Sequence, residues 1–205
     1  MSEAERIDIE VGEADEARRI AVLCRTGKAP AVIWLGGYRS DMAGTKAEAL
    51  DKRGAENGQC VVRFDYSGHG RSGGDFLDGS ISRWLAESSA VIEQNTDAPP
   101  ILVGSSMGGY LALLTALGSF AAGTPVAGLV LLAPAVDMTE RLMWEEFPGE
   151  VRAEIMEKGV WVESSQYDPA GNPITMTLIE DGRHYLVMDR ATLQVGCPVH
   201  ILHGR

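Results

Sequence analysis

The feature that most constrains this chain is a serine placed between a short apolar run and a long one. Residues 101–103 are apolar, Gly104-Ser105-Ser106-Met107-Gly108 follows, and residues 110–117 are again almost wholly apolar. A short apolar run suits a buried strand, and a longer one suits a buried helix. A turn sharp enough to join them crowds the backbone, so small residues are needed two places before and after its apex. The pattern predicts strand, sharp turn and helix, with Ser106 at the apex.

A turn of this kind is a nucleophile elbow, which lifts a serine oxygen clear of a sheet edge. Serine is a weak nucleophile at neutral pH, so an exposed Ser106 needs a neighbouring base before it can react. The helix that follows directs its free N–H groups and its positive end at the site. The amide of Met107 is therefore a predicted donor to an oxyanion. The alternative is that Ser106 only caps the helix.

A second oxyanion donor is predicted in the loop after an earlier strand. Residues 31–35 are apolar and end in Gly36-Gly37-Tyr38, where two glycines let the chain turn back over the sheet edge. Beside an elbow the second donor comes from such a loop, and we predict that it is the amide of Tyr38. An ordinary Gly-Gly turn is the alternative.

A second Gly-x-Ser-x-Gly match, at residues 70–74, is predicted to be a loop because no helical segment follows it. Upstream, Asp65 ends an apolar run and precedes small residues, which is typical of a tight turn that bonds to its own backbone. His69 in this turn precedes Ser106, whereas the order expected with an elbow is serine, acid, histidine. We therefore predict structural roles for Asp65 and His69.

Apolar runs and helical stripes alternate along the chain, which is typical of a mostly parallel sheet covered by helices on both faces. Residues 7–11 predict an exposed edge strand, with residues 19–24 as its antiparallel partner. The alternation breaks over about residues 137–194, which we interpret as a cap over the carboxyl ends of the strands, where ligands bind in such sheets. The other predicted elements are strands at 31–35, 60–64, 101–103, 129–133 and 197–204, helices at 42–57, 79–95 and 110–117, and short cap helices at 139–147 and 150–158.

Large apolar residues of the cap can serve in either of two ways. They can line a pocket for an acyl chain, or they can form the core of the cap, which is the commoner role for residues at such spacings. The residues concerned are Met143, Trp144, Phe147, Met156 and Trp161.

The length and the net charge of the chain limit the classes of protein to which it can belong. A chain of 205 residues predicts a single domain, residues 1–205, and it contains no apolar run of about 18 residues that could span a membrane. The net charge of −11 leaves no basic stripe to bind nucleic acid or an anionic membrane surface. The sequence shows no metal-ligand spacing and no dinucleotide or phosphate loop, so we expect neither a metal nor a cofactor.

Cysteine usage and the N-terminus indicate a compartment. Three widely spaced cysteines, Cys24, Cys60 and Cys197, predict buried free thiols rather than disulfides. The first residues are polar and acidic, unlike a secretory signal. We therefore expect a cytoplasmic protein.

Six stretches of the sequence are together more specific than the elbow alone. They are residues 35–38, 44–47, 63–68, 102–109, 158–161 and 197–204, of which the third and fifth discriminate best. On these stretches nearly the whole chain resembles the α/β-hydrolases of the palmitoyl-protein thioesterase and acyl-glucuronide esterase group and their bacterial relatives. The resemblance implies an α/β-hydrolase fold, Ser106 as nucleophile, and hydrolysis of esters or thioesters of small molecules or acylated proteins.

The resemblance also implies residues that the sequence does not contain. In such enzymes an acid follows the strand matching residues 199–203 and a histidine lies well beyond it, so we expect these 205 residues to be a fragment. An internal order Ser106, Asp137, His184 is permitted, but His184 falls in the cap, which makes it a minor alternative. A non-catalytic module that binds an acyl or small apolar ligand is the second main hypothesis, and a peptidase or lipase of the same fold is a third. The natural substrate and the oligomeric state do not follow from the sequence.

Overall fold

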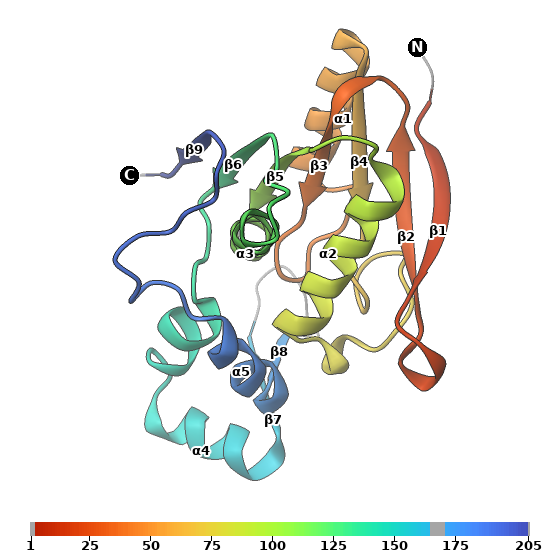
Figure 1. Cartoon of the computed structure of the whole chain (residues 1–205). Coiled ribbons are helices and arrows are strands. Elements are labelled where there is room, and N and C mark those ends of the chain that lie inside the picture. Colours follow the sequence, from red (N-terminus) through yellow and green to blue (C-terminus); the bar gives the residue numbers. More distant parts are fainter. Residues whose placement is uncertain (1–2, 165–170, 205) are drawn as a thin grey trace.

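A twisted seven-stranded sheet forms the centre of the molecule (Figure 1). The computed structural model describes residues 3–164 and 171–204. The strand order is β1-β2-β4-β3-β5-β6-β9, antiparallel between the first three and parallel across the rest. The bounds are β1 Glu5–Val11, β2 Arg18–Arg25, β3 Lys28–Leu35, β4 Gln59–Phe64, β5 Ile101–Ser105, β6 Gly128–Leu132 and β9 Val199–Leu202. The mostly parallel sheet and the antiparallel edge pair were both predicted, and both are confirmed.

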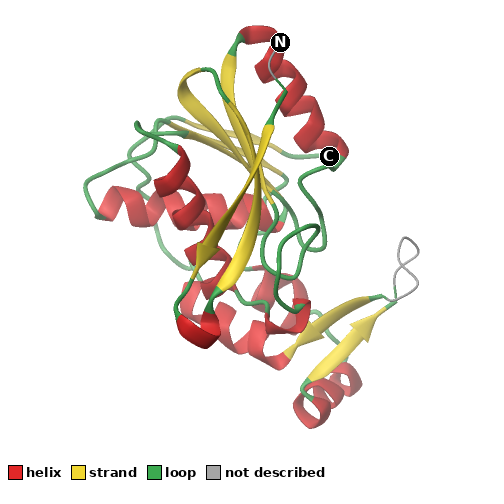
Figure 2. Ribbon diagram, turned by 90° about the vertical axis from the view of Figure 1, so that its right-hand side faces the viewer, coloured by secondary structure: helices red, strands yellow, loops and turns green. Residues whose placement is uncertain are grey.

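Helices cover both faces of this sheet, as the alternating pattern predicts (Figures 1 and 2). On one face α1 (Thr45–Asn57) packs against β4, and on the other α2 (Ile81–Asn95) and α3 (Met107–Ala121) pack against each other. The start of α2 is fixed by Ser80, whose side chain accepts a hydrogen bond from the amide of Arg83. Because α3 is buried by the sheet and by α2, its sequence is apolar on nearly every side.

The main core lies between the sheet and the α2–α3 layer. Its largest fully buried side chains are Trp84, Tyr66, Tyr110 and Phe64. Glu87 is a fully buried residue of α2 that pairs with Arg18 of β2 and accepts a hydrogen bond of 2.9 Å from the amide of Ser67. The core thus supports the loop after β4 from below.

The segment after β6 lies beyond the carboxyl ends of the parallel strands, and its β7–β8 hairpin stands apart from the central sheet (Figures 1 and 2). Helices in the first part and a final strand were predicted, and both are confirmed, although the first helix is wound as a π-helix. Residues 176–185 are helical. Pro169, Gly171 and Pro173 predict a turn, part of which lies outside the described residues. The elements are η3 Met138–Trp144, α4 Gly149–Lys158, β7 Val160–Glu163, β8 Asn172–Thr175, α5 Met176–Gly182 and η4 Arg183–Tyr185.

The cysteines differ from expectation in their burial. Cys24, Cys60 and Cys197 are free but only partly buried, so the prediction of buried thiols is wrong. Burial fades toward the end of β2 and the start of β4, which lie side by side because these strands are antiparallel. Partial desolvation still raises the pKa of all three thiols.

Candidate active site

Ser106 occupies the apex of a sharp turn between β5 and α3. It is exposed, although residues 102–105 before it and 107–116 after it are all buried. Its backbone lies at φ 54° and ψ −121°, a strained conformation for a residue with a side chain. The Ser106 amide donates to the carbonyl of Leu132 at 3.0 Å, and the Ser106 carbonyl accepts from Gly109 and Ala135 at 2.9 and 3.1 Å. These hydrogen bonds fix the turn against β6 and the start of α3.

The small residues of the turn are required by close backbone contacts. A Cβ at Gly108 would overlap the carbonyl oxygens of Leu35 and Gly36 at the end of β3. A Cβ at Gly104 would overlap the backbone of Gly108 across the turn. The predicted need for glycine on both sides of Ser106 is therefore confirmed.

The loop after β3 returns to the elbow and carries the second predicted donor. A Cβ built on Gly37 would lie 3.5 Å from the Cβ of Ser106. The Ser40 amide donates to the Gly37 carbonyl at 3.0 Å and closes a tight turn around Tyr38. Within the described part of the chain, the amides of Tyr38 and Met107 have no hydrogen-bond acceptor. Two free N–H groups therefore flank the exposed serine, and their role as oxyanion donors stays a prediction.

The Tyr38 side chain joins this loop to the hairpin beyond the sheet. Its hydroxyl donates a hydrogen bond to the carbonyl of Pro173 in β8. Its ring meets Phe76 and Trp84 edge to face, with centroids 5.0 and 5.9 Å apart. Burial raises the pKa of Tyr38. Nothing in the local sequence signals this contact, because the two partners lie far apart along the chain.

The Asp65 turn has the structural role that was predicted. The Asp65 carboxylate accepts hydrogen bonds from the amides of Met42 and Arg71 at 2.6 and 2.8 Å. Burial raises the pKa of this carboxyl, and the two amide donors oppose that shift. Ser72, the serine of the second glycine-rich match, donates its hydroxyl to the carbonyl of Asp65 and accepts from the amide of Ala21. Its oxygen is therefore engaged in holding the turn.

His69 lies beneath the same turn and is buried. Its Nδ1 lies 3.1 Å from the carbonyl oxygen of Ser67, and its Nε2 lies 3.2 Å from the amide nitrogen of Arg39. Burial, with a smaller effect of the Arg39 charge, lowers the pKa of His69 to about 4. The ring is thus neutral at physiological pH and bridges two loops.

The internal triad is not assembled in the structure. Asp137 is fully buried. Its carboxylate accepts one hydrogen bond of 2.9 Å from the amide of Val187 and another of 2.9 Å from the amide of Met188. Among the described residues, no hydrogen bond joins Asp137 to His184 or any group to the hydroxyl of Ser106. Asp137 therefore anchors the segment that leads away from η4.

The five large apolar residues of the cap do not act as one group. Phe147 and Trp161 meet edge to face at 5.3 Å, and the guanidinium of Arg183 lies 5.2 Å above the ring of Trp144. Met143 packs against the main core. Met156 lies on the outer side of α4 and is 62% exposed. It is therefore part of neither a pocket nor a core.

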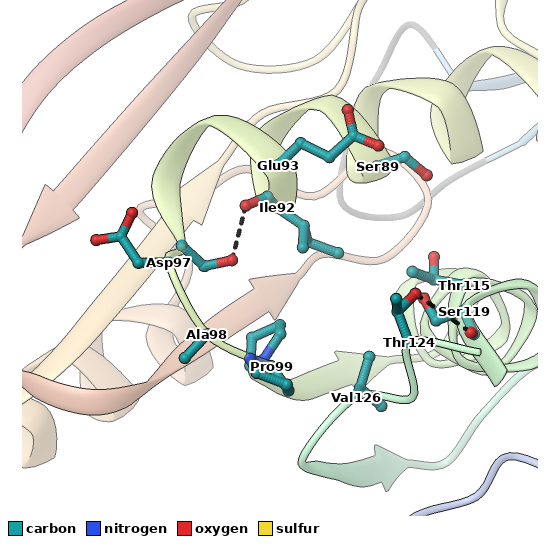
Figure 3. Close-up of a pocket in the computed structure, with 12 residues that line it drawn as sticks. Ser89, Ile92, Glu93, Asp97, Ala98, Pro99, Thr115, Ser119, Thr124 and Val126 are labelled. Atoms are coloured by element: carbon teal, nitrogen blue, oxygen red, sulfur yellow. Dashed lines mark hydrogen bonds between the residues drawn. The ribbon is translucent and has the colours of Figure 1, made fainter. Parts of the chain in front are cut away.

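Cavities occur at both ends of the sheet. One of about 420 Å³ lies between the carboxyl ends of α2 and α3 and is lined by Glu93, Thr96, Asp97 and Thr124, among others (Figure 3). It adjoins the residues that precede β5 and β6, whereas Ser106 follows β5, so it lies at the opposite end of these strands from the elbow. Another of about 380 Å³ lies beside the elbow and is lined by Trp34, Gly37, Lys46 and Ser105, among others.

Residues 3–164 and 171–204 contain neither a cluster of metal-binding side chains nor a helix that could span a membrane. No group of three or more histidine, cysteine, aspartate or glutamate side chains in this part of the chain could hold a metal ion. None of its helices combines the length and apolarity needed to cross a bilayer.

The sequence and the fold of this chain are similar to those of known hydrolases. The family described as serine aminopeptidase, S33, matches residues 31–190. The human mitochondrial palmitoyl-protein thioesterase ABHD10 is 35% identical over 179 residues, which are 87% of this chain and 57% of that protein. The chain therefore spans little more than half the length of this curated relative.

Two solved structures share the fold closely. A protein from Agrobacterium vitis described as a hydrolase is 47% identical, with a TM-score of 0.92 over 98% of this chain and 78% of its own. Mouse α/β-hydrolase domain-containing protein 10 is 30% identical, with a TM-score of 0.83 over the same shares.

Proposed function

The chain belongs to the α/β-hydrolase superfamily, in the family described as serine aminopeptidase, S33, and on this premise we propose that it is a serine hydrolase of carboxylic esters or thioesters. One observation carries the proposal. Ser106 is exposed in a strained turn whose neighbours on both sides are buried, and free amides flank it. A strained, exposed serine beside unpaired donors is the arrangement that acyl transfer requires.

In the proposed reaction Ser106 Oγ attacks the carbonyl carbon of the substrate. The carbonyl oxygen becomes an oxyanion, which the amides of Tyr38 and Met107 stabilise by hydrogen bonds. A base takes the serine proton and passes it to the departing alcohol or thiol, leaving an acyl group on Ser106. Water then attacks the acyl-enzyme by the same route, which releases the acid and restores the serine.

We propose that the base and its orienting acid lie outside these 205 residues. The Ser106 hydroxyl has no hydrogen-bond partner in the described part of the chain, and both Asp137 oxygens accept backbone amides. A serine without its base retains only a residual rate from the oxyanion hole and from binding.

The names of the relatives and the charge of the chain support a proposal for the substrate class. Proteins named as palmitoyl-protein thioesterases support a thioester of an acylated protein, and small-molecule esters are the related possibility. Acidic residues outnumber basic ones in the segment after β6, which favours neutral acyl groups over anionic ones. We propose that the reaction needs neither a metal nor a cofactor. The free thiols favour a reducing compartment, and we propose the cytoplasm, although the curated relatives are named mitochondrial.

The test is covalent labelling of the complete reading frame that contains this sequence. A fluorophosphonate should add to Ser106, and the adduct should be located by peptide mass spectrometry. Ser106→Ala should abolish labelling, whereas Ser72→Ala should leave the labelled peptide unchanged in any folded fraction. Acyl thioesters, acyl glucuronides and peptides should then be compared as substrates. An intact fold that binds acyl ligands without labelling would favour the non-catalytic binding module instead.

A further inference from the structure

The loop that carries the Tyr38 amide is held in an unfavourable shape. Its turn is closed by the hydrogen bond from the Ser40 amide to the Gly37 carbonyl. Arg39 occupies the third position of this turn at φ 55°, where glycine is usual. A side chain in the left-handed region costs about 1 kcal/mol or more. Some contact must therefore stabilise Arg39 in place.

The hydrogen bonds of His69 define its tautomer. The carbonyl of Ser67 can only accept, so the nitrogen facing it, Nδ1, carries the proton. The other nitrogen, Nε2, then holds a lone pair and accepts the Arg39 amide at 3.2 Å. His69 is therefore the acceptor that meets the strained residue.

Three aromatic rings and two hydrogen bonds hold the imidazole in place. It is only 4% exposed and contacts the rings of Tyr66, Phe76 and Trp84 at centroid distances of 5.7, 4.9 and 5.4 Å. A ring packed in this way cannot rotate away from the Arg39 amide without disturbing its neighbours. The acceptor position is consequently set by the core.

We propose that His69 is a positioning residue, which holds the Arg39 amide and thereby sets the direction of the neighbouring Tyr38 N–H toward the oxyanion. Arg39 N belongs to the same planar peptide unit as the Tyr38 carbonyl, so fixing one end of that unit restricts the Tyr38 backbone. His69 contacts no reacting atom in this scheme. The proposal rests on the proposed hydrolase function, since it concerns the geometry of the same site.

The experiment compares His69→Phe and His69→Gln with wild type in the complete protein. Phenylalanine keeps a packed ring but removes the acceptor, and glutamine supplies a carbonyl oxygen that can accept. Loss of one oxyanion donor lowers kcat by about 100- to 1,000-fold, so its misplacement should cost about 10- to 100-fold. We expect His69→Phe to lower kcat by that factor with KM within about twofold, because ground-state binding does not use the oxyanion donors. His69→Gln should recover part of the rate.

Tyr66→Leu is the matched control rather than a change at Phe76, because the Phe76 ring also contacts the Arg39 guanidinium at 5.2 Å. Tyr66→Leu disturbs the same aromatic cluster but leaves both hydrogen bonds of His69 in place. Its kcat should fall far less than that of His69→Phe at a comparable loss of stability in urea. An equal fall in kcat for the two variants would reduce His69 to a packing role and overturn the proposal.

A second readout does not depend on turnover. Amide hydrogen exchange at Arg39 should accelerate in His69→Phe and not in Tyr66→Leu, and unchanged exchange at Arg39 in His69→Phe would overturn the proposal. Wild-type protein that neither turns over nor labels at Ser106 would instead refute the hydrolase function. Wild-type turnover with an unchanged kcat in His69→Phe would refute the positioning role alone.

Discussion

The elbow and the cap, residues 137–194, lie at the same end of the sheet but are held by different forces. The elbow is fixed by backbone packing, since Gly108 presses on the end of β3 and Ser106 bonds to β6. The cap is joined to the core by side-chain hydrogen bonds from Ser82, Tyr110 and Tyr38 and by buried apolar residues such as Leu178 and Val187, but four of its large apolar side chains are exposed. The exposed ones are Leu142, Met156, Val162 and Met188. The elbow is thus rigid, while we expect the segment over it to open at lower cost.

The largest effect should come from the elbow. Gly108→Ala forces a Cβ into two carbonyl oxygens, and because both belong to backbone they cannot move away cheaply. We expect a loss of about 4 kcal/mol or more in the free energy of unfolding, or no folded protein. Gly118→Ala in the same helix meets nothing within 4 Å and should gain about 0.5–1 kcal/mol. Urea denaturation measures both, and equal midpoints for the two variants would contradict close packing at the elbow.

The next effect should come from the anchor of the cap. Asp137→Ala leaves the buried amide of Val187 and the part-buried amide of Met188 without an acceptor, which should cost about 3 kcal/mol. Asp189→Ala is the control, because its carboxylate is exposed and, among the described residues, pairs with Arg141 alone, so the change should lie within about 0.5 kcal/mol.

Hydrogen exchange separates local from global loss in the Asp137→Ala variant. If the cap is a separate unit of stability, its amides should exchange faster while those of α3 keep their protection. Uniform acceleration through α3 would show that cap and elbow unfold together, and the contrast between them would fail.

The elbow was predictable from sequence because its determinants are local. An apolar run, two glycines and an apolar helix lie within some twenty residues, and each restricts the backbone of its neighbours. The alternation of strands and helices follows from the same periodicity. The structural role of Asp65 was also predictable, since a turn aspartate bonds to amides nearby.

The parts that escaped prediction depend on contacts between distant residues. Tyr38 bonds to Pro173, and Asp137 to Val187, across long separations that leave no local pattern. The bridge from His69 to Arg39 is of the same kind. The exposure of Met156 also could not be predicted from the sequence, because a short helix with few buried residues shows no clear apolar face. Half-burial of the thiols depends on how far the helices extend over the sheet.

His69 bears on the comparison between elbow and cap, because it holds the loop that lies beside the elbow through the Arg39 amide. Its folded pKa of about 4 lies below the ordinary value of 6.5, so the unfolded chain binds a proton first as pH falls. The stability contributed by neutral His69 is therefore complete above pH 6.5 and is lost progressively toward pH 4, by about 2 kcal/mol at pH 5.

His69→Phe removes this titration. The stability difference between wild type and variant should consequently shrink by about 2 kcal/mol between pH 7 and pH 5, measured by urea titration at each pH. A constant difference across this range would mean that His69 is not held neutral by burial, and the imidazole would then not be a fixed acceptor.

The smallest effect should come from the outer side of the cap. Met156 is 62% exposed on α4, while Ile155 beside it is fully buried. Met156→Ser should change the free energy of unfolding by no more than about 0.5 kcal/mol, because little apolar area leaves water when the cap folds. If Met156 lies outside the acyl path, KM should also stay constant across thioesters of short and long acyl chain. A rise in KM confined to the long chains would place Met156 against the substrate, which requires the cap to close inward during binding.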